Sequence, residues 1–474
     1  MENAKDIQYN RVKPWQIYAW SIHDVVANCF LFLMNFVLYL AIGEYAILTT
    51  TIFLILTGSR ILDGITDPII AYIVERTDSK WGCYRPMMVL GYAICCITVL
   101  CMFFFCIPGN LVTFIVLYVI YIIGYSFFIT SSGGARAIFT NDPIQRGKMG
   151  RWIAVFIALF YSAAGYYVSN VVVPAHGGIV TSALQQLAIT FMIVAGIVLV
   201  IAIKAIKDYD VPERYRCING KTVSFSDMFV TLKNNRNLQM AIVAFGSDKL
   251  CTQSASNSAV TMAVWGVVAG NYAFSGQLSM ITLVPAILLM FYGTNIAMKL
   301  GNKMAVKRFS VLGILFAAAI ILLFAFGGPE NIGTSIPITA LFLVLYCLYY
   351  GCQQVNTAVI RPMVADVTDS EMVRTGGKQL GAVINATFTF ADKVISSLAS
   401  TVVGFSFALI GYTTTLPQTG DPKTGPIVAV ALFLWMGLPI LGYICSLVAM
   451  KFYSLDIDSV SEIQKWISDN RKAE

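Results

Sequence analysis

Long uninterrupted apolar blocks constrain the fold of this chain more than any other feature of its sequence. Pro86 to Phe103 and Leu432 to Met450 are two examples. About 20 residues of α-helix, rising about 1.5 Å per residue, match the roughly 30 Å hydrocarbon core of a bilayer. Only 12% of the 474 residues are charged, about half the fraction that is usual in a soluble domain. The chain is therefore expected to be an integral membrane protein.

The apolar blocks predict about twelve membrane spans. Backbone amides within lipid must be hydrogen bonded internally, which favours helices, and the sequence lacks the short alternating segments of a membrane barrel. The fold class expected is an all-α membrane protein with twelve transmembrane helices in two six-helix bundles. The predicted spans are residues 16–42, 46–74, 86–106, 111–139, 150–173 and 183–204, then 239–267, 274–298, 309–327, 334–363, 379–411 and 426–450.

A polar stretch divides these spans into two groups of six. The predicted organisation is an N-terminal bundle over residues 1–206, a central cytoplasmic loop over 207–238, a C-terminal bundle over 239–453 and a cytoplasmic tail over 454–474. Each half also carries a basic segment after its second span. Duplicated six-helix halves of this kind are a known plan among transporters.

Lysine and arginine are concentrated in alternate connections between the spans. The opposite set of connections contains Lys423 as its only lysine or arginine. Cytoplasmic loops of membrane proteins carry an excess of Lys and Arg, so both termini are expected in the cytoplasm of a multi-pass protein of the cell membrane. This placement accounts for the net charge of +7 without a nucleic-acid partner.

Charged residues inside predicted spans are the most informative, because a charge near the bilayer centre costs on the order of 3 kcal/mol or more. Arg60, Asp63 and Asp67 all lie in the second span. In a helix the two carboxylates would be about 40° and one turn apart, with Arg60 on the same face. Two such carboxylates cannot both stay ionised unless a proton, a metal cation or Arg60 compensates them. The pair predicts a cation-coupling site, and a static Arg–Asp pair between helices is the alternative.

Other spans contain polar residues that could line a shared cavity. For Asp24 and Lys393 we favour solute binding over interhelical pairing. Two interpretations remain for Asp248 and Lys249 in the seventh span and for Arg361 near the end of the tenth. Their side chains could take part in function, or they could extend along the helix to reach water. The candidate substrate-binding residues are Asp24, Asn28, Gln354, Arg361 and Lys393.

Two neighbouring segments resemble a known transporter signature. Residues 60–68 read RILDGITDP and residues 76–86 read RTDSKWGCYRP. Together they resemble the glycoside–pentoside–hexuronide:cation symporters of the major facilitator superfamily. The likeness extends to Asp24, residues 140–146, residues 363–369 and Lys393. The resemblance implies the major facilitator fold and cation-coupled transport of a sugar, glycoside or sugar acid.

The resemblance also implies roles for individual residues of a cation site. Asp63 and Asp67 resemble the paired carboxylates of that site, and they would be metal ligands if the cation is Na⁺. Thr66 lies between them, and Ser126 resembles a hydroxyl residue near the site. Arg60 would belong to the charge network around the pair.

On the solute side, Asp24 resembles the acceptor of sugar hydroxyls, and Lys393 resembles a lysine that faces the cation site. Ile129 and Gly133 depart from the family pattern, because its best-known member has an aspartate and a sugar-stacking tryptophan there. These departures favour H⁺ over Na⁺ as the coupling ion. Arg361 and Lys393 favour a carboxylated sugar, since a guanidinium matches a carboxylate bidentately.

The mechanism predicted is alternating access by two bundles around a central site. A channel, a binding-only sensor and a membrane enzyme are less favoured, and His23 and His176 are the only histidines. The main alternative is a transporter of the same fold for a non-sugar solute such as an amphipathic lipid. We expect no enzymatic activity, no cofactor beyond the coupling H⁺ or Na⁺, and a small-molecule solute and membrane lipid as partners.

Overall fold

A computed structural model of the chain describes residues 11–77, 79–105, 109–140, 142–211, 225–376 and 381–471. These residues form helices and no strand, apart from an isolated bridge between Ser79 and Gly82. The chain divides into two compact units, Met1–Gly220 and Lys221–Glu474. The division falls within the segment expected to separate the bundles, and part of that segment is the helix α11 (Phe225–Asn234). The all-α fold class is confirmed.

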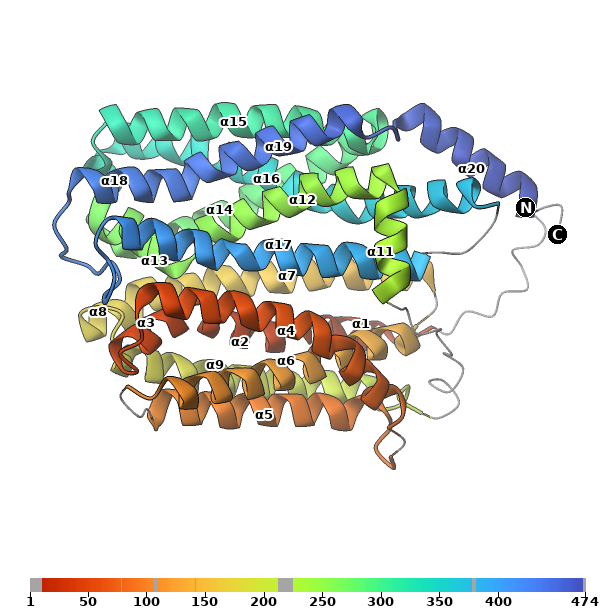
Figure 1. The fold of residues 1–474 in the computed structure, drawn as a ribbon, viewed down its shortest axis with the longest axis horizontal. Coiled ribbons are helices and arrows are strands. Elements are labelled where there is room, and N and C mark those ends of the chain that lie inside the picture. Colours follow the sequence, from red (N-terminus) through yellow and green to blue (C-terminus); the bar gives the residue numbers. More distant parts are fainter. Residues whose placement is uncertain are drawn as a thin grey trace. The chain divides into compact units, whose positions relative to one another are not determined.

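The helices of the first unit coincide with the apolar blocks of the sequence. Figure 1 shows how these helices are arranged. The first span is interrupted twice, so that three short helices replace the single one expected. The elements are α1 (Pro14–Ser21), α2 (Asp24–Met34), α3 (Val37–Gly43), α4 (Thr49–Glu75), α5 (Tyr84–Phe104), α6 (Leu111–Phe139), α7 (Pro143–Tyr167), the π-helix η1 (Val168–Val172), α8 (Val173–His176) and α9 (Thr181–Ile206).

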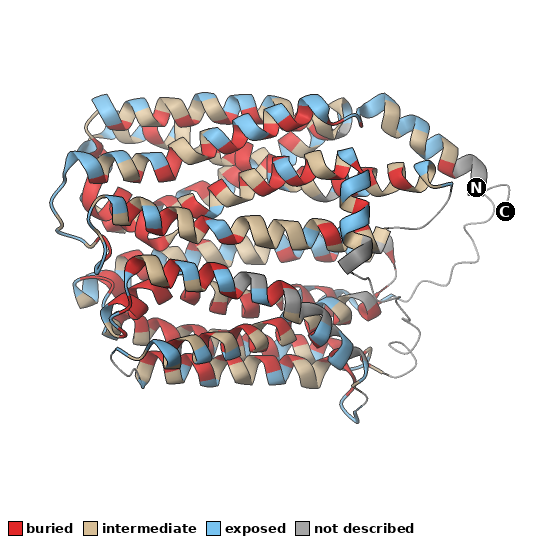
Figure 2. Cartoon of the chain, in the orientation of Figure 1, coloured by how far each residue is buried: buried red, intermediate tan, exposed pale blue. Residues whose placement is uncertain are grey.

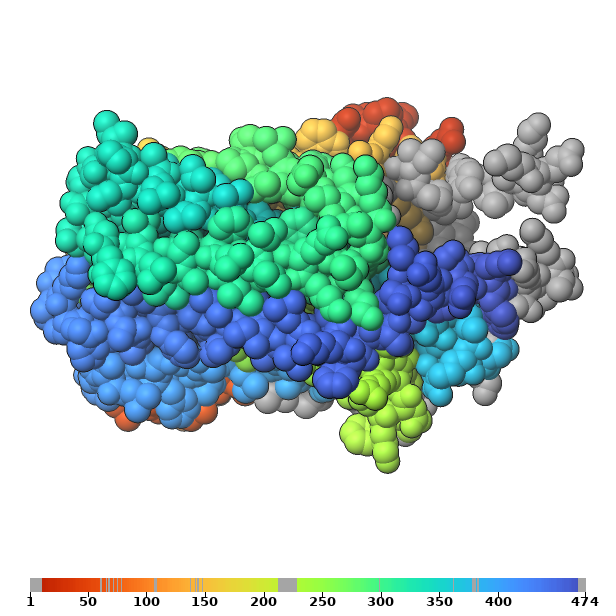
Figure 3. Space-filling model, turned by 90° about the horizontal axis from the view of Figure 1, so that it is seen from above, coloured from red at the N-terminus to blue at the C-terminus, as the bar shows by residue number. Residues whose placement is uncertain are grey.

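The second unit begins with α11 and ends with a helix in the predicted tail. Figure 3 shows α15 and α19 side by side on its surface. The remaining elements are α12 (Arg236–Ala255), α13 (Ser258–Thr261), η2 (Met262–Val268), α14 (Tyr272–Leu300), α15 (Asn302–Phe326), η3 (Pro329–Asn331), α16 (Ile336–Arg374), α17 (Gly381–Leu409), α18 (Gly425–Leu432), η4 (Phe433–Gly437), α19 (Leu438–Phe452) and α20 (Ile457–Arg471).

Within the described ranges, 10 helical segments are long and apolar enough to cross a bilayer. The other two expected spans correspond to α4 and to the stretch from α12 to η2. α4 has 27 residues but contains Arg60, Asp63 and Asp67, and α12 contains Asp248 and Lys249. Their polar residues lower the mean hydropathy, so length and hydropathy alone recover ten of the expected twelve spans.

The tenth span is longer than the sequence predicts. We expected it to end near residue 363. Pro362 lies just before that point, and a proline within a helix removes a backbone donor and crowds the preceding turn. Instead α16 continues through Pro362, and Asp366 and Asp369 lie within the helix rather than after it. Two side chains hold these extra turns: Asn302 donates to Asp366 at 3.0 Å, and Gln464 donates to Asp369 at 2.6 Å.

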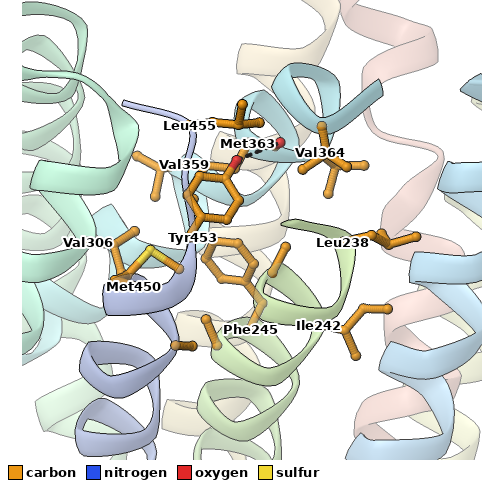
Figure 4. Close-up of a cluster of buried hydrophobic side chains, with 14 of the residues drawn as sticks. Leu238, Ile242, Phe245, Val306, Val359, Met363, Val364, Met450, Tyr453 and Leu455 are labelled. Carbon is orange, nitrogen blue, oxygen red and sulfur yellow. Dashed lines mark hydrogen bonds between the residues drawn. The ribbon is translucent and has the colours of Figure 1, made fainter. Parts of the chain in front are cut away.

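Buried residues lie on the faces that the helices turn toward one another, and exposed apolar residues lie on the outer faces (Figure 2). Exposed outward apolar side chains are what a surrounding bilayer would cover. In the second unit, Tyr453 donates to the carbonyl oxygen of Met363 at 3.4 Å within an apolar cluster (Figure 4). The other labelled members are Leu238, Ile242, Phe245, Val306, Val359, Val364, Met450 and Leu455.

Helices α5 and α6 approach each other closely at two glycines. A Cβ atom on Gly91 would lie 2.6 Å from the backbone nitrogen of Phe128, and one on Gly124 would lie 2.6 Å from the side chain of Ile94. Larger residues at either position would force the helices apart, since glycine alone lets backbones pack this closely.

Asp210, which follows α9, caps the start of α5. Its buried carboxylate accepts hydrogen bonds from the backbone N–H groups of Cys83, Tyr84 and Arg85 at 2.9–3.3 Å. These groups have no partner within the helix, and a negative charge at a helix N-terminus is favourable. Gly82 precedes them with φ of 97°, and a Cβ there would lie 2.3 Å from Asp210. This buried carboxylate was not predicted from the sequence.

Candidate functional site

Asp63 of α4 makes a buried contact with α6. The residue is 4% exposed, and the hydroxyl of Ser126 donates to its Oδ1 at 2.5 Å. A hydrogen bond to a charged group contributes about 1.5–3 kcal/mol, and such bonds are short. The structure thus brings together two of the residues that the sequence analysis placed in one cation site.

A small pocket opens beside Asp63 in the first unit. Its volume is about 10 Å³, room for about one water-sized species. Among the described lining residues, Asp63 is the only acidic or basic one. Such a pocket suits a proton or a small cation and is too small for a sugar. The lining residues are Leu31, Met34, Asp63, Tyr118, Tyr121, Ile122 and Tyr125.

The other expected members of the cation site are less well defined. The hydroxyl of Thr66 donates to the backbone carbonyl of Asp63 at 3.1 Å, so its proton is directed at its own helix and not at the carboxylate. The side chains of Arg60 and Asp67 lie outside the described part of the chain. Their contribution to the site remains a prediction.

A second polar cluster surrounds the start of α2. Asp24 accepts from Nη2 of Arg136 at 3.1 and 3.2 Å, and its Oδ1 lies 3.0 Å from Nε2 of His23. His23 is fully buried, with Nδ1 2.6 Å from the carbonyl oxygen of Trp20 and its ring stacked on the Trp20 indole. The side chains of Asp24 and Arg136 are 17% and 34% exposed. An acid, an arginine and a histidine therefore share one partly accessible site.

Asn28 extends this cluster to α7. Its amide donates to the backbone carbonyl of Asp24 at 2.7 Å, and the hydroxyl of Tyr161 donates to its Oδ1 at 3.0 Å. Asp24 and Asn28 were predicted from the sequence as substrate-binding residues, whereas Arg136, His23 and Tyr161 were not. Two signals could have found the first two: a charged residue inside the span 111–139, and a histidine directly before an aspartate within a span.

The second unit contains a separate set of polar residues. Nζ of Lys249 in α12 donates to Asp392 of α17 at 2.5 Å. The neighbouring Asp248 is 7% exposed, and its carboxylate has no ion-pair or hydrogen-bond partner among the residues that the structure describes. A static pair thus accounts for Lys249 but not for Asp248.

The remaining solute-binding candidates lie in α16 and α17. Gln354 lies half-buried in α16, and Lys393 lies half-buried in α17 beside Asp392. The side chain of Arg361 lies outside the described part of the chain. The solute-binding roles of these three residues remain predictions.

A sequence model of the MFS/sugar transport protein family matches residues 23–457. The chain belongs to this family. YagG of Escherichia coli (strain K12), provisionally named a glycoside/cation symporter, is 24% identical over 440 residues, which are 90% of this chain and 87% of YagG. The uncharacterized symporter YnaJ of Bacillus subtilis (strain 168) is 22% identical over 87% of this chain and 85% of its own length.

Solved structures show the same fold at low sequence identity. The nucleoside transporter NupG is 12% identical with a TM-score of 0.61, and the alignment covers 93% of this chain and 99% of NupG. The E. coli fucose:proton symporter FucP is 13% identical with a TM-score of 0.52 and covers 93% and 97%. The major facilitator fold and the multi-pass membrane topology are therefore confirmed. The family of sugar transport proteins does not favour an amphipathic lipid as the solute.

Proposed function

We propose that this transporter is a secondary active symporter that carries a sugar, glycoside or sugar acid across the cell membrane together with H⁺ or Na⁺. The observation that carries the proposal is the buried Asp63–Ser126 contact beside a pocket sized for one small cation. The symporter names given to YagG and YnaJ support it. Both termini would lie in the cytoplasm, on the side where the basic connections are concentrated.

The coupling mechanism follows from the cost of burying an uncompensated charge. An ionised Asp63 within a membrane-spanning unit is costly unless hydrogen bonds or a cation stabilise it. Ser126 supplies one hydrogen bond, and a bound cation neutralises the charge. The loaded carrier can then change conformation more readily than the carrier with ionised Asp63. Coupling is a difference in cation affinity between the two orientations of the carrier.

The pocket favours H⁺ as the coupling ion. A sodium ion requires several oxygen ligands, whereas the described lining of the pocket contains one carboxylate and three tyrosines, and Ser126 already donates its hydroxyl proton to that carboxylate. Asp67 would complete a sodium site if its side chain turns toward Asp63. The solute would bind elsewhere. Asp24 and Asn28 are the candidate residues in the first unit, and Gln354, Arg361 and Lys393 are the candidates in the second.

The test is accumulation of labelled sugars by proteoliposomes under an imposed proton or sodium gradient. We expect Asp63→Asn to abolish gradient-driven accumulation but to retain exchange of labelled for unlabelled solute, because the amide cannot carry the coupling charge. Asp67→Asn should behave in the same way. Asp458→Asn, at an exposed site at the start of α20, is the matched control and should accumulate solute normally. Normal accumulation by both Asp63→Asn and Asp67→Asn would disprove the coupling assignment.

A further inference from the structure

One face of α6 connects the cation site to the Asp24 cluster. Ser126, Ile129, Gly133 and Arg136 follow helical spacing, so they lie along one side of the helix. Ile129 is 39% exposed, and a Cβ atom added to Gly133 would meet no atom within 4 Å. An open space therefore adjoins the turn before Arg136, on the helix face that also carries Ser126.

Arg136 has donor capacity that the structure leaves unused. A guanidinium carries five N–H donors, and Nη2 is directed at Asp24. The Nε atom is buried and has no acceptor among the described residues. A buried donor without a partner is costly, which indicates that another acceptor occupies this position in some state of the carrier. A carboxylate matches the planar fork of an arginine with two parallel hydrogen bonds.

His23 gives Asp24 a second possible cationic partner. Its Nδ1 lies against a carbonyl oxygen, which only accepts, so Nδ1 carries a proton. When Nε2 is unprotonated, its lone pair can accept from Nη2 of Arg136 at 3.4 Å. When Nε2 is protonated, it donates to Asp24 at 3.0 Å and repels Arg136. The protonation of one ring nitrogen thus decides which cation holds Asp24.

Charge balance indicates what Arg136 does once it is released. With neutral His23, the charges of Asp24 and Arg136 cancel. One added proton leaves the cluster with a net positive charge in a partly buried site, and an anionic group on the solute would restore neutrality. Among the described side chains, the charged groups in contact with His23 are Asp24 from α2 and Arg136 from α6.

We propose that Arg136 binds the carboxylate of an acidic solute, and that uptake of one proton by His23 releases Arg136 from Asp24 for this purpose. The proton bonds to Nε2 of His23, the His23–Asp24 pair replaces the Arg136–Asp24 pair, and the solute carboxylate becomes the new partner of Arg136. The inference rests on the proposed transport function, which already includes sugar acids, and assigns the arginine that would bind their carboxylate and the histidine whose protonation would release it. The solute ring would lie in the space beside Gly133.

The experiment measures binding to the purified full-length transporter in lipid nanodiscs between pH 5.5 and pH 8. The probes are glucuronate, galacturonate and gluconate, and the uncharged comparisons are glucose, galactose and the methyl ester of glucuronate. The wild type should bind at least one acid tenfold or more tightly than its uncharged counterpart, with higher affinity at low pH. Arg136→Gln should weaken binding of that acid at least tenfold, so that the acid loses its advantage over its uncharged counterpart. Arg236→Gln, an exposed arginine of the second unit, should change neither.

His23→Gln provides a second test if Arg136→Gln does not fold, as judged by its unfolding temperature. It should bind the acid with the weaker affinity that the wild type shows at pH 8, and this affinity should no longer vary with pH. Equal binding of the acid by wild type and Arg136→Gln, or an unchanged pH dependence in His23→Gln, would overturn the inference. Gradient-driven accumulation of an uncharged sugar without any binding of acids would overturn the inference and leave the proposed function intact. Failure to bind or accumulate any of these solutes would overturn both.

Discussion

Replacement of Ser126 by alanine should distinguish proton coupling from sodium coupling. The substitution removes the hydrogen bond of 2.5 Å to the buried carboxylate of Asp63. Hydrogen bonds to charged groups contribute about 1.5–3 kcal/mol, which corresponds to about 10- to 150-fold in an equilibrium constant. The lost bond stabilises the ionised carboxylate and not its protonated form, so the two coupling ions should respond in opposite directions.

For a proton, Ser126→Ala should tighten binding at Asp63. The pH at which transport is half-maximal should rise by at least about one unit. The reason is that the ionised carboxylate of Asp63 loses about 1.4 kcal/mol or more of stabilisation, whereas its protonated form does not. For a sodium ion, the same change removes an oxygen ligand. The sodium concentration at half-maximal transport should then increase about tenfold.

The assay is uptake of labelled sugar by proteoliposomes at a series of internal and external pH values and sodium concentrations. Ser132→Ala is the matched control. The hydroxyl of Ser132 is also buried in α6, but it donates to the backbone carbonyl of Ile129 and not to a carboxylate. Ser132→Ala should leave both ion dependences unchanged. If Ser126→Ala leaves them unchanged as well, the Asp63–Ser126 contact is not part of the coupling site.

Three further predictions concern stability and are measured by thermal unfolding in detergent. Asp210→Ala should reduce stability by about 1–3 kcal/mol, because three N–H groups at the start of α5 lose their acceptor; an unchanged unfolding temperature would refute this capping role. Lys249→Gln should destabilise more than the double variant with Asp392→Asn, since the single change leaves a carboxylate unpaired; additive effects would show that the two residues are not coupled. The hydrogen bond from Lys423 lowers the pKa of the exposed carboxyl of Glu330. The hydrogen bond therefore contributes fully to the free energy of unfolding above the unfolded-state pKa of about 4.3, and this contribution is lost as the pH falls through the lowered folded-state pKa of Glu330. Any difference in stability between wild type and Glu330→Gln should disappear in acid.

The membrane spans were predictable because lipid imposes one simple requirement on composition. Uninterrupted apolar blocks such as residues 183–204 correspond directly to single helices, here α9. The contact between Asp63 and Ser126 was also expected, through the family resemblance. The interruption of the first span after Ser21 and the continuation of α16 through Pro362 were not. Both depend on local packing and hydrogen bonds that hydropathy does not encode.

The missed site residues show why burial and pairing are harder to predict than span positions. Arg136 lies in the last turn of its helix, where an arginine usually reaches toward water, and only the fold shows that it pairs with Asp24. Asp210 lies in a polar connection where an acidic residue is unremarkable in the sequence. Its capping role depends on residues more than a hundred positions earlier in the chain. Contacts between distant segments require the tertiary structure.

The glycine contacts between α5 and α6 limit which part of the cation site can rearrange. Because α5 and α6 pack closely at Gly91 and Gly124, they cannot slide or separate without losing these contacts. The two helices should therefore move together as one rigid body. Ser126 belongs to this rigid pair of helices, whereas Asp63 belongs to α4. Release of the coupling ion should therefore require α4 to move relative to Ser126. A cross-link between α4 and α6 should block the transport cycle, whereas a cross-link between α5 and α6 should not.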